Sequence, residues 1–238
     1  MNKSLAFFGR DKELEQLRSL HALRKYVLIV GPAGIGKTAL LRQIRQHCPL
    51  LICEKTSSLR RICDGLERQL GWIHHKLNVI ERKNRLLAHL EKRGEPVVFD
   101  HAAHTPPRVA RFMGFLAEKI PIWIVSRADH PHEIRHIWPE LYKFVRFQIA
   151  PLTLLETRAI VEQAAALGNI QGDAQGHADE LHRICDGSPR ILKQLLIELG
   201  TRRYRIDSAF GLDLLELDRR IHEIDVAVGT TAGTSSRK

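Results

Sequence analysis

One stretch of the chain, residues 27–38, constrains the fold more than any other. It reads Val-Leu-Ile-Val-Gly-Pro-Ala-Gly-Ile-Gly-Lys-Thr. The first four residues are apolar, with two Val and one Ile among them, as is typical of a short buried strand. A turn rich in Gly and Pro follows, and the apolar residues after Lys37 and Thr38 recur at helical spacing. The stretch therefore predicts a strand, a tight loop and a helix in direct succession.

Residues 31–38 fit the G-x-x-x-x-G-K-[ST] pattern of a phosphate-binding loop. Glycines let backbone N–H groups curl around the α- and β-phosphates, and the helix that follows points its positive dipole end at the same anion. Lys37 is expected to reach the β- and γ-phosphates, and the Thr38 hydroxyl to bind Mg²⁺. An ordinary Gly-rich turn is the alternative, which the strand-loop-helix context disfavours. The cofactors expected are ATP or ADP with Mg²⁺, held by Gly31, Pro32, Ala33, Gly34, Ile35, Gly36, Lys37, Thr38 and Ala39.

Polar residues follow two further apolar runs. Asp100 ends the run 95–99, and in phosphate-loop ATPases a carboxylate at such a strand end holds Mg²⁺. An Asp that simply leaves a strand for a turn is the alternative. Ser126 and Arg127 end the run 121–125, where a polar or cationic group can sense the γ-phosphate. We therefore expect Asp100 to bind the metal ion with Thr38, and Ser126 and Arg127 to lie near the phosphates.

The order of elements predicts an α/β fold. Strands are expected at 27–30, 50–53, 95–99, 121–125 and 144–149, with helices between them, and such alternation of nearly continuous apolar runs is typical of a parallel sheet covered on both faces. Helices are expected at 11–23 with Asp11 as cap, after Ser57 or Ser58 as cap and up to about residue 70, at 79–93 and at 106–119 with Thr105 as cap. After residue 150 only helical patterns remain, beginning with a capping box from Thr153 to Glu156.

We therefore predict three regions. A five-stranded parallel sheet between helices forms a nucleotide-binding α/β domain over 1–150, a small all-helical domain covers 151–225, and a polar tail, expected to be disordered, covers 226–238. Further helices are expected at 177–185, 189–199 and 209–223.

The charge of the chain favours polyanionic partners. There are 37 Lys and Arg against 27 Asp and Glu, giving a net charge of +10, which points to nucleic acid first and to an anionic membrane second. No apolar run approaches the ~18 residues of a membrane span, the N-terminus does not resemble a secretory signal, and the four Cys form no C-x-x-C pair. A cytoplasmic protein that makes no membrane contact is expected.

Basic residues gather in two segments that are candidates for DNA contact. If DNA binds, Arg82, Lys83 and Arg85 are expected to contribute. The segments contain Arg60, Arg61, Arg68, Lys76, Arg82, Lys83, Arg85, Lys92 and Arg93, and then Arg202, Arg203 and Arg205.

Over residues 5–200 the chain resembles the ATPase core of the AAA+ and STAND class, nearest the branch of origin-recognition initiators and STAND ATPases. Residues 31–38 match its Walker A motif, residues 97–100 its Walker B motif and residues 124–127 its sensor-1 strand. The resemblance implies that residues 151–225 form a helical lid domain, that Phe8, Gly9 and Arg10 lie near the adenine, that Pro189 approaches the base and that Arg190 occupies the sensor-2 position. It also implies that Arg127 reads the γ-phosphate and that the chain forms homo-oligomers.

The chain departs from the family at the position after Asp100, where a second acidic residue is usual. His101 stands there and could act as the base, since its ordinary pKa suits proton transfer near neutral pH. Slow hydrolysis, with the protein working as a binding switch, is the interpretation we favour. A transition-metal site formed by Asp100, His101 and His104 is a weaker alternative to the Mg²⁺ role, and an Arg finger acting in trans could come from Arg135 or Arg146.

Three functions remain open. The first is an ATP-dependent AAA+-like switch, an ATPase by resemblance, that oligomerises on duplex DNA. The second is a STAND-type signalling switch whose nucleotide state gates assembly with a separate effector protein. The third is a small-molecule kinase. It is the weakest of the three, because a kinase of this kind does not need the long helical lid that follows the sheet.

Overall fold

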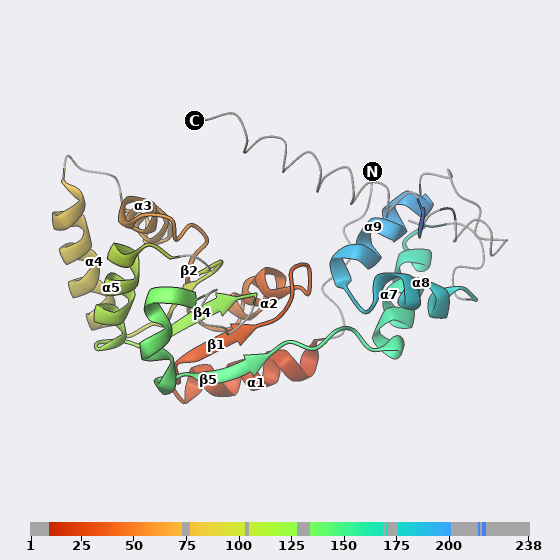
Figure 1. The fold of residues 1–238 in the computed structure, drawn as a ribbon, viewed down its shortest axis with the longest axis horizontal. Helices are drawn as coiled ribbons and strands as arrows, with labels where there is room; N and C mark the ends of the chain where they lie inside the picture. The colour runs from red at the N-terminus through yellow and green to blue at the C-terminus, as the bar shows by residue number, and fades with distance from the viewer. Residues whose placement is uncertain are drawn as a thin grey trace. The chain divides into compact units, whose positions relative to one another are not determined.

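The computed structural model describes residues 10–72, 77–102, 105–127, 134–168, 170, 176–200, 214, 216 and 217. These residues divide into two compact units, Arg10–Ala150 and the residues from Pro151 onward. The first unit is a sheet flanked by helices, and the described elements of the second are all helices (Figure 1).

The sheet of the first unit has five parallel strands in the order β2-β3-β4-β1-β5. The predicted five-stranded parallel sheet is therefore confirmed. Its inner strands are buried along their whole length, which explains why they read as continuous apolar runs in the sequence. The strands are β1 (Val27–Val30), β2 (Leu51–Cys53), β3 (Val97–Phe99), β4 (Ile122–Ser126) and β5 (Val145–Gln148).

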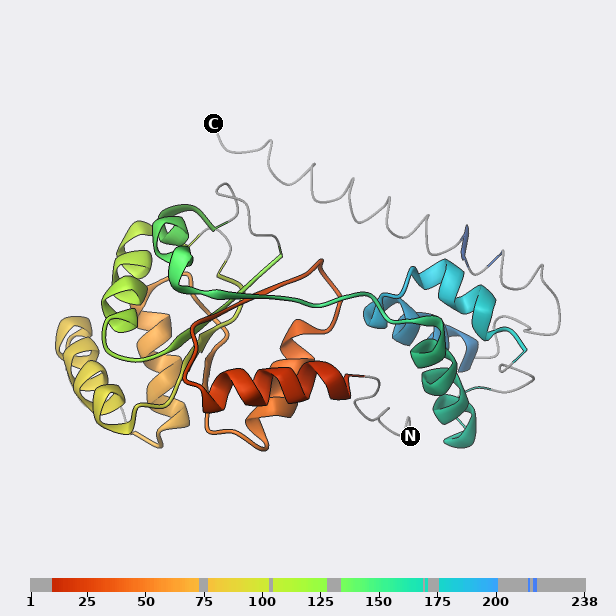
Figure 2. The same ribbon diagram turned by 90° about the horizontal axis from the view of Figure 1, so that it is seen from below.

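Helices cover both faces of this sheet (Figures 1 and 2). The helices α3, α4 and α5 and the 3₁₀ helix η1 pack on one face, and α1 and α2 lie on the other. The arrangement is the covered parallel sheet that the sequence predicts. The bounds are α1 (Asp11–Ala22), α2 (Lys37–Arg45), α3 (Leu59–Gln69), α4 (Val79–Arg93), α5 (Pro107–Ala117) and η1 (Arg135–Lys143).

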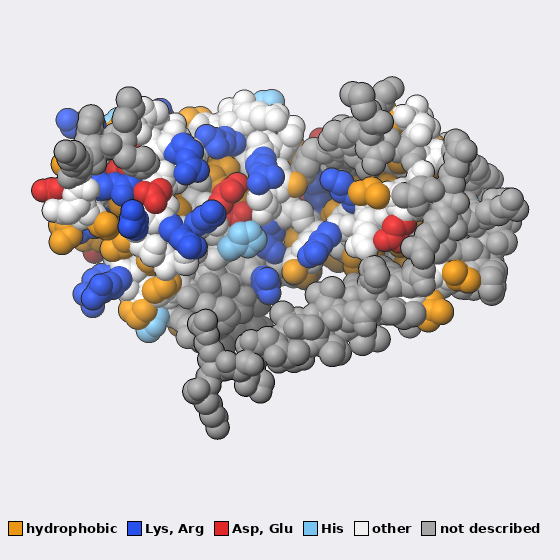
Figure 3. Space-filling view, turned by 90° about the horizontal axis from the view of Figure 1, so that it is seen from above, with side chains coloured by type: hydrophobic (Ala, Val, Ile, Leu, Met, Phe, Trp, Pro, Cys, Tyr) orange, Lys and Arg blue, Asp and Glu red, His pale blue; other side chains and the backbone are white. Residues whose placement is uncertain are grey.

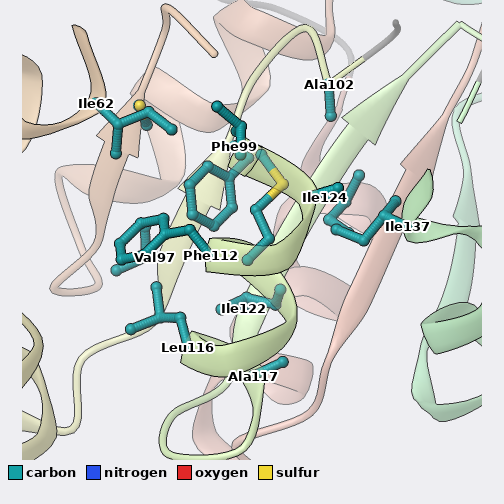
Figure 4. Packing of buried hydrophobic residues seen from close by; sticks show 14 of the residues in the cluster. Ile62, Val97, Phe99, Ala102, Phe112, Leu116, Ala117, Ile122, Ile124 and Ile137 are labelled. Carbon is teal, nitrogen blue, oxygen red and sulfur yellow. The ribbon is translucent and has the colours of Figure 1, made fainter. Parts of the chain in front are cut away.

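The main core lies between the sheet and the group formed by α3, α4, α5 and η1. Alternate strand residues such as Phe99 and Ile124 point to this side, where Phe112 and Leu116 of α5 meet them (Figure 4). Because side chains alternate across a strand, the residues between them face the other layer. Trp123 does so, and its ring makes an edge contact with His21 of α1.

The edge strand β2 is closed by a side chain. The Gln69 amide of α3 accepts a hydrogen bond from the Ile52 N–H at 3.0 Å and donates one to the Ile52 carbonyl at 2.7 Å. It thus imitates a neighbouring strand, and an edge protected in this way is a poor template for pairing with another chain.

Two predicted helix caps are wrong. Asp11 is the first helical residue of α1, and Arg10 precedes it as the cap position. Pro106 occupies the corresponding position of α5, because the Thr105 hydroxyl donates instead to the Ala102 carbonyl. Ser58, one of the two predicted candidates, caps α3 through its side chain, and Asn78, which was not predicted, caps α4.

The second unit begins with the predicted capping box. The Thr153 hydroxyl accepts from the Glu156 N–H, and the Glu156 carboxylate accepts from the Thr153 N–H. The described helices are α7 (Leu154–Ala166), α8 (Ala178–Cys185) and α9 (Pro189–Gly200), which share an apolar core. The predicted helix 209–223 lies almost wholly outside the described residues, as does the tail 226–238.

Gly187 ties the first segment of this unit to the turn between α8 and α9. Its carbonyl accepts from the Leu152 N–H at 2.8 Å, and its φ of +64° lies in the left-handed region. A Cβ at this position would lie 2.6 Å from the Leu152 carbonyl oxygen. Only glycine fits here without a shift of the backbone.

Among the described helices, none combines the length and the apolar character needed to cross a membrane.

Candidate nucleotide-binding site

The loop of residues 31–36 joins the carboxyl end of β1 to the N-terminus of α2. Gly34 and Gly36 have φ values of +85° and +99°, and Gly36 is the residue that precedes α2. A Cβ at Gly31 would lie 3.0 Å from the Ile35 side chain. The turn therefore needs glycine for its backbone conformation at two positions and for close packing at a third.

Lys37 begins α2 and is turned back into the loop. Its Nζ donates to the carbonyl oxygens of Gly31, at 2.5 Å, and of Pro32, at 2.8 Å, and the residue is only 8% exposed. Burial lowers the pKa of Lys37, Arg127 lowers this pKa further, and Asp100 raises it. Burial and a nearby cation both disfavour the charged form of Lys37. A bound anion would stabilise that charged form.

Thr38 and Asp100 meet beside this loop. The Thr38 hydroxyl donates to the Asp100 carboxylate, with 2.7 Å between Oγ1 and Oδ2. Asp100 is completely buried, and its other oxygen accepts the His101 N–H at 2.9 Å. A hydroxyl and a carboxylate in contact are hard oxygen ligands of the kind that Mg²⁺ takes, so these two residues fit the metal ion.

Ser126 and Arg127 lie at the end of β4, which pairs with β1 so that Ser126 is level with Val30. Ser126 is 2% exposed, and within the described part of the chain its hydroxyl finds no hydrogen-bond partner. A buried hydroxyl requires a partner, so this group is available to a ligand or to water next to the loop. Arg127 is exposed, and its charge acts on Lys37.

His101 borders the site from the turn after β3. Its side chain is 65% exposed, and Nε2 lies 3.8 Å from Asp100 Oδ2. Its φ of +57° is unusual for a residue that is not glycine. The described residues contain no group of three His, Cys, Asp or Glu able to hold a metal ion, and His104 lies outside them.

Arg10, the residue directly before α1, contacts the phosphate-binding loop through its side chain. Its guanidinium group donates to the Glu13 carboxylate at 2.6 Å and to the Ala150 carbonyl at 2.7 Å, and it reaches the Ile35 carbonyl at 3.4 Å. These contacts connect the loop with the end of the α/β unit. Contact of Arg10 with a nucleotide stays a prediction.

The remaining predicted nucleotide contacts are in other parts of the chain. Phe8 and Gly9 lie outside the described residues. Pro189 and Arg190 are the first two residues of α9, and Arg190 is exposed. Their approach to the base and to the phosphates stays a prediction.

The predicted DNA-facing group of Arg82, Lys83 and Arg85 needs a correction at its first member. Arg82 is buried, and its guanidinium donates to the carboxylates of Glu67 and Asp64 of α3. An Arg held in this way has no free face for a phosphate. Arg85 is exposed and lies over the Trp72 ring at 4.3 Å.

Sequence reasoning missed the residues that hold the Asp100 turn in place. The Thr56 hydroxyl donates to the His101 carbonyl at 3.0 Å, and the Asp100 N–H donates to the Cys53 carbonyl at 2.9 Å. Neither contact follows from a motif, because each joins β2 and its following segment to a strand more than forty residues away.

Comparisons with known proteins agree on the fold. The profile of the family described as AAA ATPase domain matches residues 6–206. No curated protein matches the sequence. Many solved structures are similar at low sequence identity, and three of them illustrate the range.

The first is a Walker-type ATPase of Pyrococcus abyssi, with a TM-score of 0.67 and 13% identity over 98% of this chain and 78% of that one. The second is the ORC1 protein of Aeropyrum pernix in complex with DNA, with a TM-score of 0.64 and 17% identity over 90% and 66%. The third is a STAND protein with a tetratricopeptide repeat sensor from Pyrococcus horikoshii, with a TM-score of 0.55 and 15% identity over 91% and 33%. The chain thus spans less than two thirds of the second protein and one third of the third.

Proposed function

This chain belongs to the AAA ATPase domain family, and we propose that it is an ATP-binding molecular switch that oligomerises on duplex DNA to regulate a DNA transaction. The observation that carries the nucleotide part is the contact between Thr38 and Asp100 beside the loop that holds Lys37. Those three residues come from the N-terminus of α2 and the end of β3, where a nucleoside triphosphate and its metal ion can be held together.

In this proposal the chain's own groups divide the work. The backbone N–H groups of residues 31–38 and the N-terminus of α2 bind phosphate oxygens, and Lys37 moves from the loop carbonyls to the β- and γ-phosphates. Thr38 and Asp100 would hold Mg²⁺, which would neutralise developing phosphate charge. Ser126 and Arg127 lie at the end of the neighbouring strand and contact the γ-phosphate, so that they distinguish ATP from ADP.

Hydrolysis is expected to be slow. The position after Asp100 carries His101, whose exposed imidazole lies at the edge of the site. The acidic residue that usually positions the attacking water in this family is absent at that position, and this absence favours slow hydrolysis over base catalysis by His101. Residence in the ATP state is therefore long, as suits a switch.

The DNA part of the proposal rests on charge. The chain carries a net charge of +10, and the ORC1 structure that it resembles in fold holds DNA. Phosphate contacts by Lys and Arg give affinity that depends strongly on salt and little on sequence.

A STAND-type switch that assembles with a separate effector protein is the second candidate. It is favoured by Arg127 at the end of β4 and by the missing acidic residue after Asp100. The fold similarity to the STAND protein of Pyrococcus horikoshii agrees with it as well.

Light scattering of the purified chain distinguishes the two candidates. We expect the particle mass to grow when ATP, Mg²⁺ and duplex DNA are all present, and to stay small with ADP or with DNA alone. Moderate salt should reduce the growth, because phosphate contacts are screened. Assembly that is indifferent to DNA at every salt concentration would contradict the DNA-bound switch and favour the signalling candidate.

A further inference from the structure

A basic groove runs along the edge of the sheet formed by β2. It has a volume of about 640 Å³ and lies between the second half of α2, the segment after β2 and one face of α3. Lys and Arg side chains gather on this part of the α/β unit in Figure 3. Its lining includes Arg42, Arg45, Lys55, Arg61, Gly65 and Arg68.

Most of the positive charge in this groove is not neutralised. Arg42 forms an exposed ion pair with Glu54 at 3.2 Å, and Asp64 is engaged by Arg82. Within the described ranges, the structure gives Arg45, Lys55 and Arg68 no ion-pair partner. Cations from three different elements therefore converge on one hollow, where the low-dielectric walls strengthen their combined field.

Gly65 keeps the groove open. It lies in the interior of α3, where glycine costs about 1 kcal/mol relative to alanine. A Cβ at this position would meet nothing within 4 Å, and its φ is not in the left-handed region. Neither packing nor backbone conformation requires glycine here, whereas a side chain would project into the groove.

The groove continues to the nucleotide-binding site. A second hollow shares Glu54, Lys55 and Arg61 with it and reaches His101. In that hollow Thr56 holds the His101 carbonyl, and the adjacent Asp100 N–H is held by the Cys53 carbonyl. The segment 54–57 is therefore common to the groove and to the turn that carries Asp100.

We propose that this groove binds the phosphate backbone of duplex DNA, and that segment 54–57 couples its occupancy to the nucleotide site. The proposal rests on the proposed function, which requires DNA binding but does not say where it occurs. The described residues that line the groove include no aromatic side chain. Sites for single strands use aromatic side chains to stack bases, so this lining fits a duplex held by its phosphates.

The test compares two triple variants of the full chain that lose the same charge. One removes groove cations (Arg45→Ala, Lys55→Ala, Arg68→Ala), and the matched control removes exposed cations that do not line the groove (Lys12→Ala, Lys25→Ala, Arg111→Ala). Affinity for a fluorescent duplex is measured by anisotropy with ATP and Mg²⁺ at several salt concentrations. Each phosphate contact contributes about 0.9 to the slope of log affinity against log salt concentration. One contact therefore strengthens binding about eightfold in 0.1 M salt relative to 1 M salt.

We expect the groove variant to lose affinity by on the order of 500-fold and to show a salt slope lower by about 3, with the control close to wild type. Equal binding by the two variants would overturn the groove while leaving the DNA-bound switch intact. A wild-type chain that binds no duplex would overturn both the groove and the proposed function.

Gly65→Leu tests the groove without changing any charge. The Leu side chain would fill the hollow and is expected to remove at least one phosphate contact, a loss of about eightfold in affinity. Its melting temperature should not fall, because Leu favours a helix interior over Gly. Wild-type affinity in a folded Gly65→Leu variant would contradict DNA binding in this groove.

Discussion

Replacing Lys37 by Ala is expected to weaken ATP binding by at least about 100-fold, because hydrogen bonds to charged groups contribute about 1.5–3 kcal/mol each. The wild-type ammonium group lies in the loop and donates to the carbonyls of Gly31 and Pro32. A bound triphosphate would offer it stronger partners and would offset the desolvation that lowers its pKa. Titration calorimetry with ATP and Mg²⁺ measures the change.

Lys12→Ala is the matched control, since it removes an exposed Lys from α1 and leaves the loop intact. Its affinity should equal that of wild type. The melting temperature of Lys37→Ala shows whether the loop and sheet remain folded. A folded Lys37→Ala chain that binds ATP as tightly as wild type would contradict the assignment of the loop as the phosphate site.

Arg82→Ala is expected to lower the free energy of unfolding of the α/β unit by about 3–5 kcal/mol, the cost of leaving a buried charge without its partner. Glu67 is only 4% exposed and receives hydrogen bonds from two nitrogens of Arg82. Asp64 loses its contact with the same guanidinium group. Urea unfolding followed by tryptophan fluorescence measures the loss.

Arg85→Ala is the control on the same helix. It removes a cation that lies over the Trp72 ring, a contact worth about 0.5–1 kcal/mol at an exposed site. The double variant Arg82→Met, Glu67→Leu should recover most of the lost stability, because the buried Glu67 carboxylate is removed together with Arg82, and Asp64, which also loses this partner, is 35% exposed. If Arg82→Ala unfolds within about 1 kcal/mol of wild type, the ion pair does not hold these helices together.

The sequence predicts the strands and helices of the α/β unit well because each carries a clear pattern. The runs 27–30 and 121–125 are continuous and apolar, and the glycine at 94 ends α4 in the left-handed conformation. The order of the strands in the sheet depends on which crossovers pack side by side, which no local pattern contains. The predicted caps of α1 and α5 are each one residue away from the observed cap position, and at α5 the Thr105 hydroxyl donates to the nearby Ala102 carbonyl, a local contact that helical periodicity does not contain.

The candidate site shows the same division. Thr38, Asp100 and Ser126 could be identified because each follows a buried strand or the loop, and parallel strands bring their carboxyl ends to one edge. The supporting contacts of Thr56 and Arg10 could not, because both join segments distant in the chain.

The position of Arg82 in α4 could have been predicted from helical periodicity, although Arg82 was grouped with its basic neighbours. It lies at helical spacing from Leu86 and Leu90, on the face of α4 that is buried. A cation on a buried face predicts an ion pair rather than a contact with DNA. The groove beside β2 could not be predicted from the sequence, because its cations come from three segments that are far apart in the chain.

The measurement that tests the central claim most directly is calorimetric titration of ATP into the wild-type chain, with Mg²⁺ and with a chelator. The contact of Thr38 with Asp100 beside the Lys37 loop predicts one ATP bound per chain, with affinity that falls when Mg²⁺ is removed. Absence of ATP binding, or binding that is indifferent to Mg²⁺, would contradict an ATP-driven switch built on these residues.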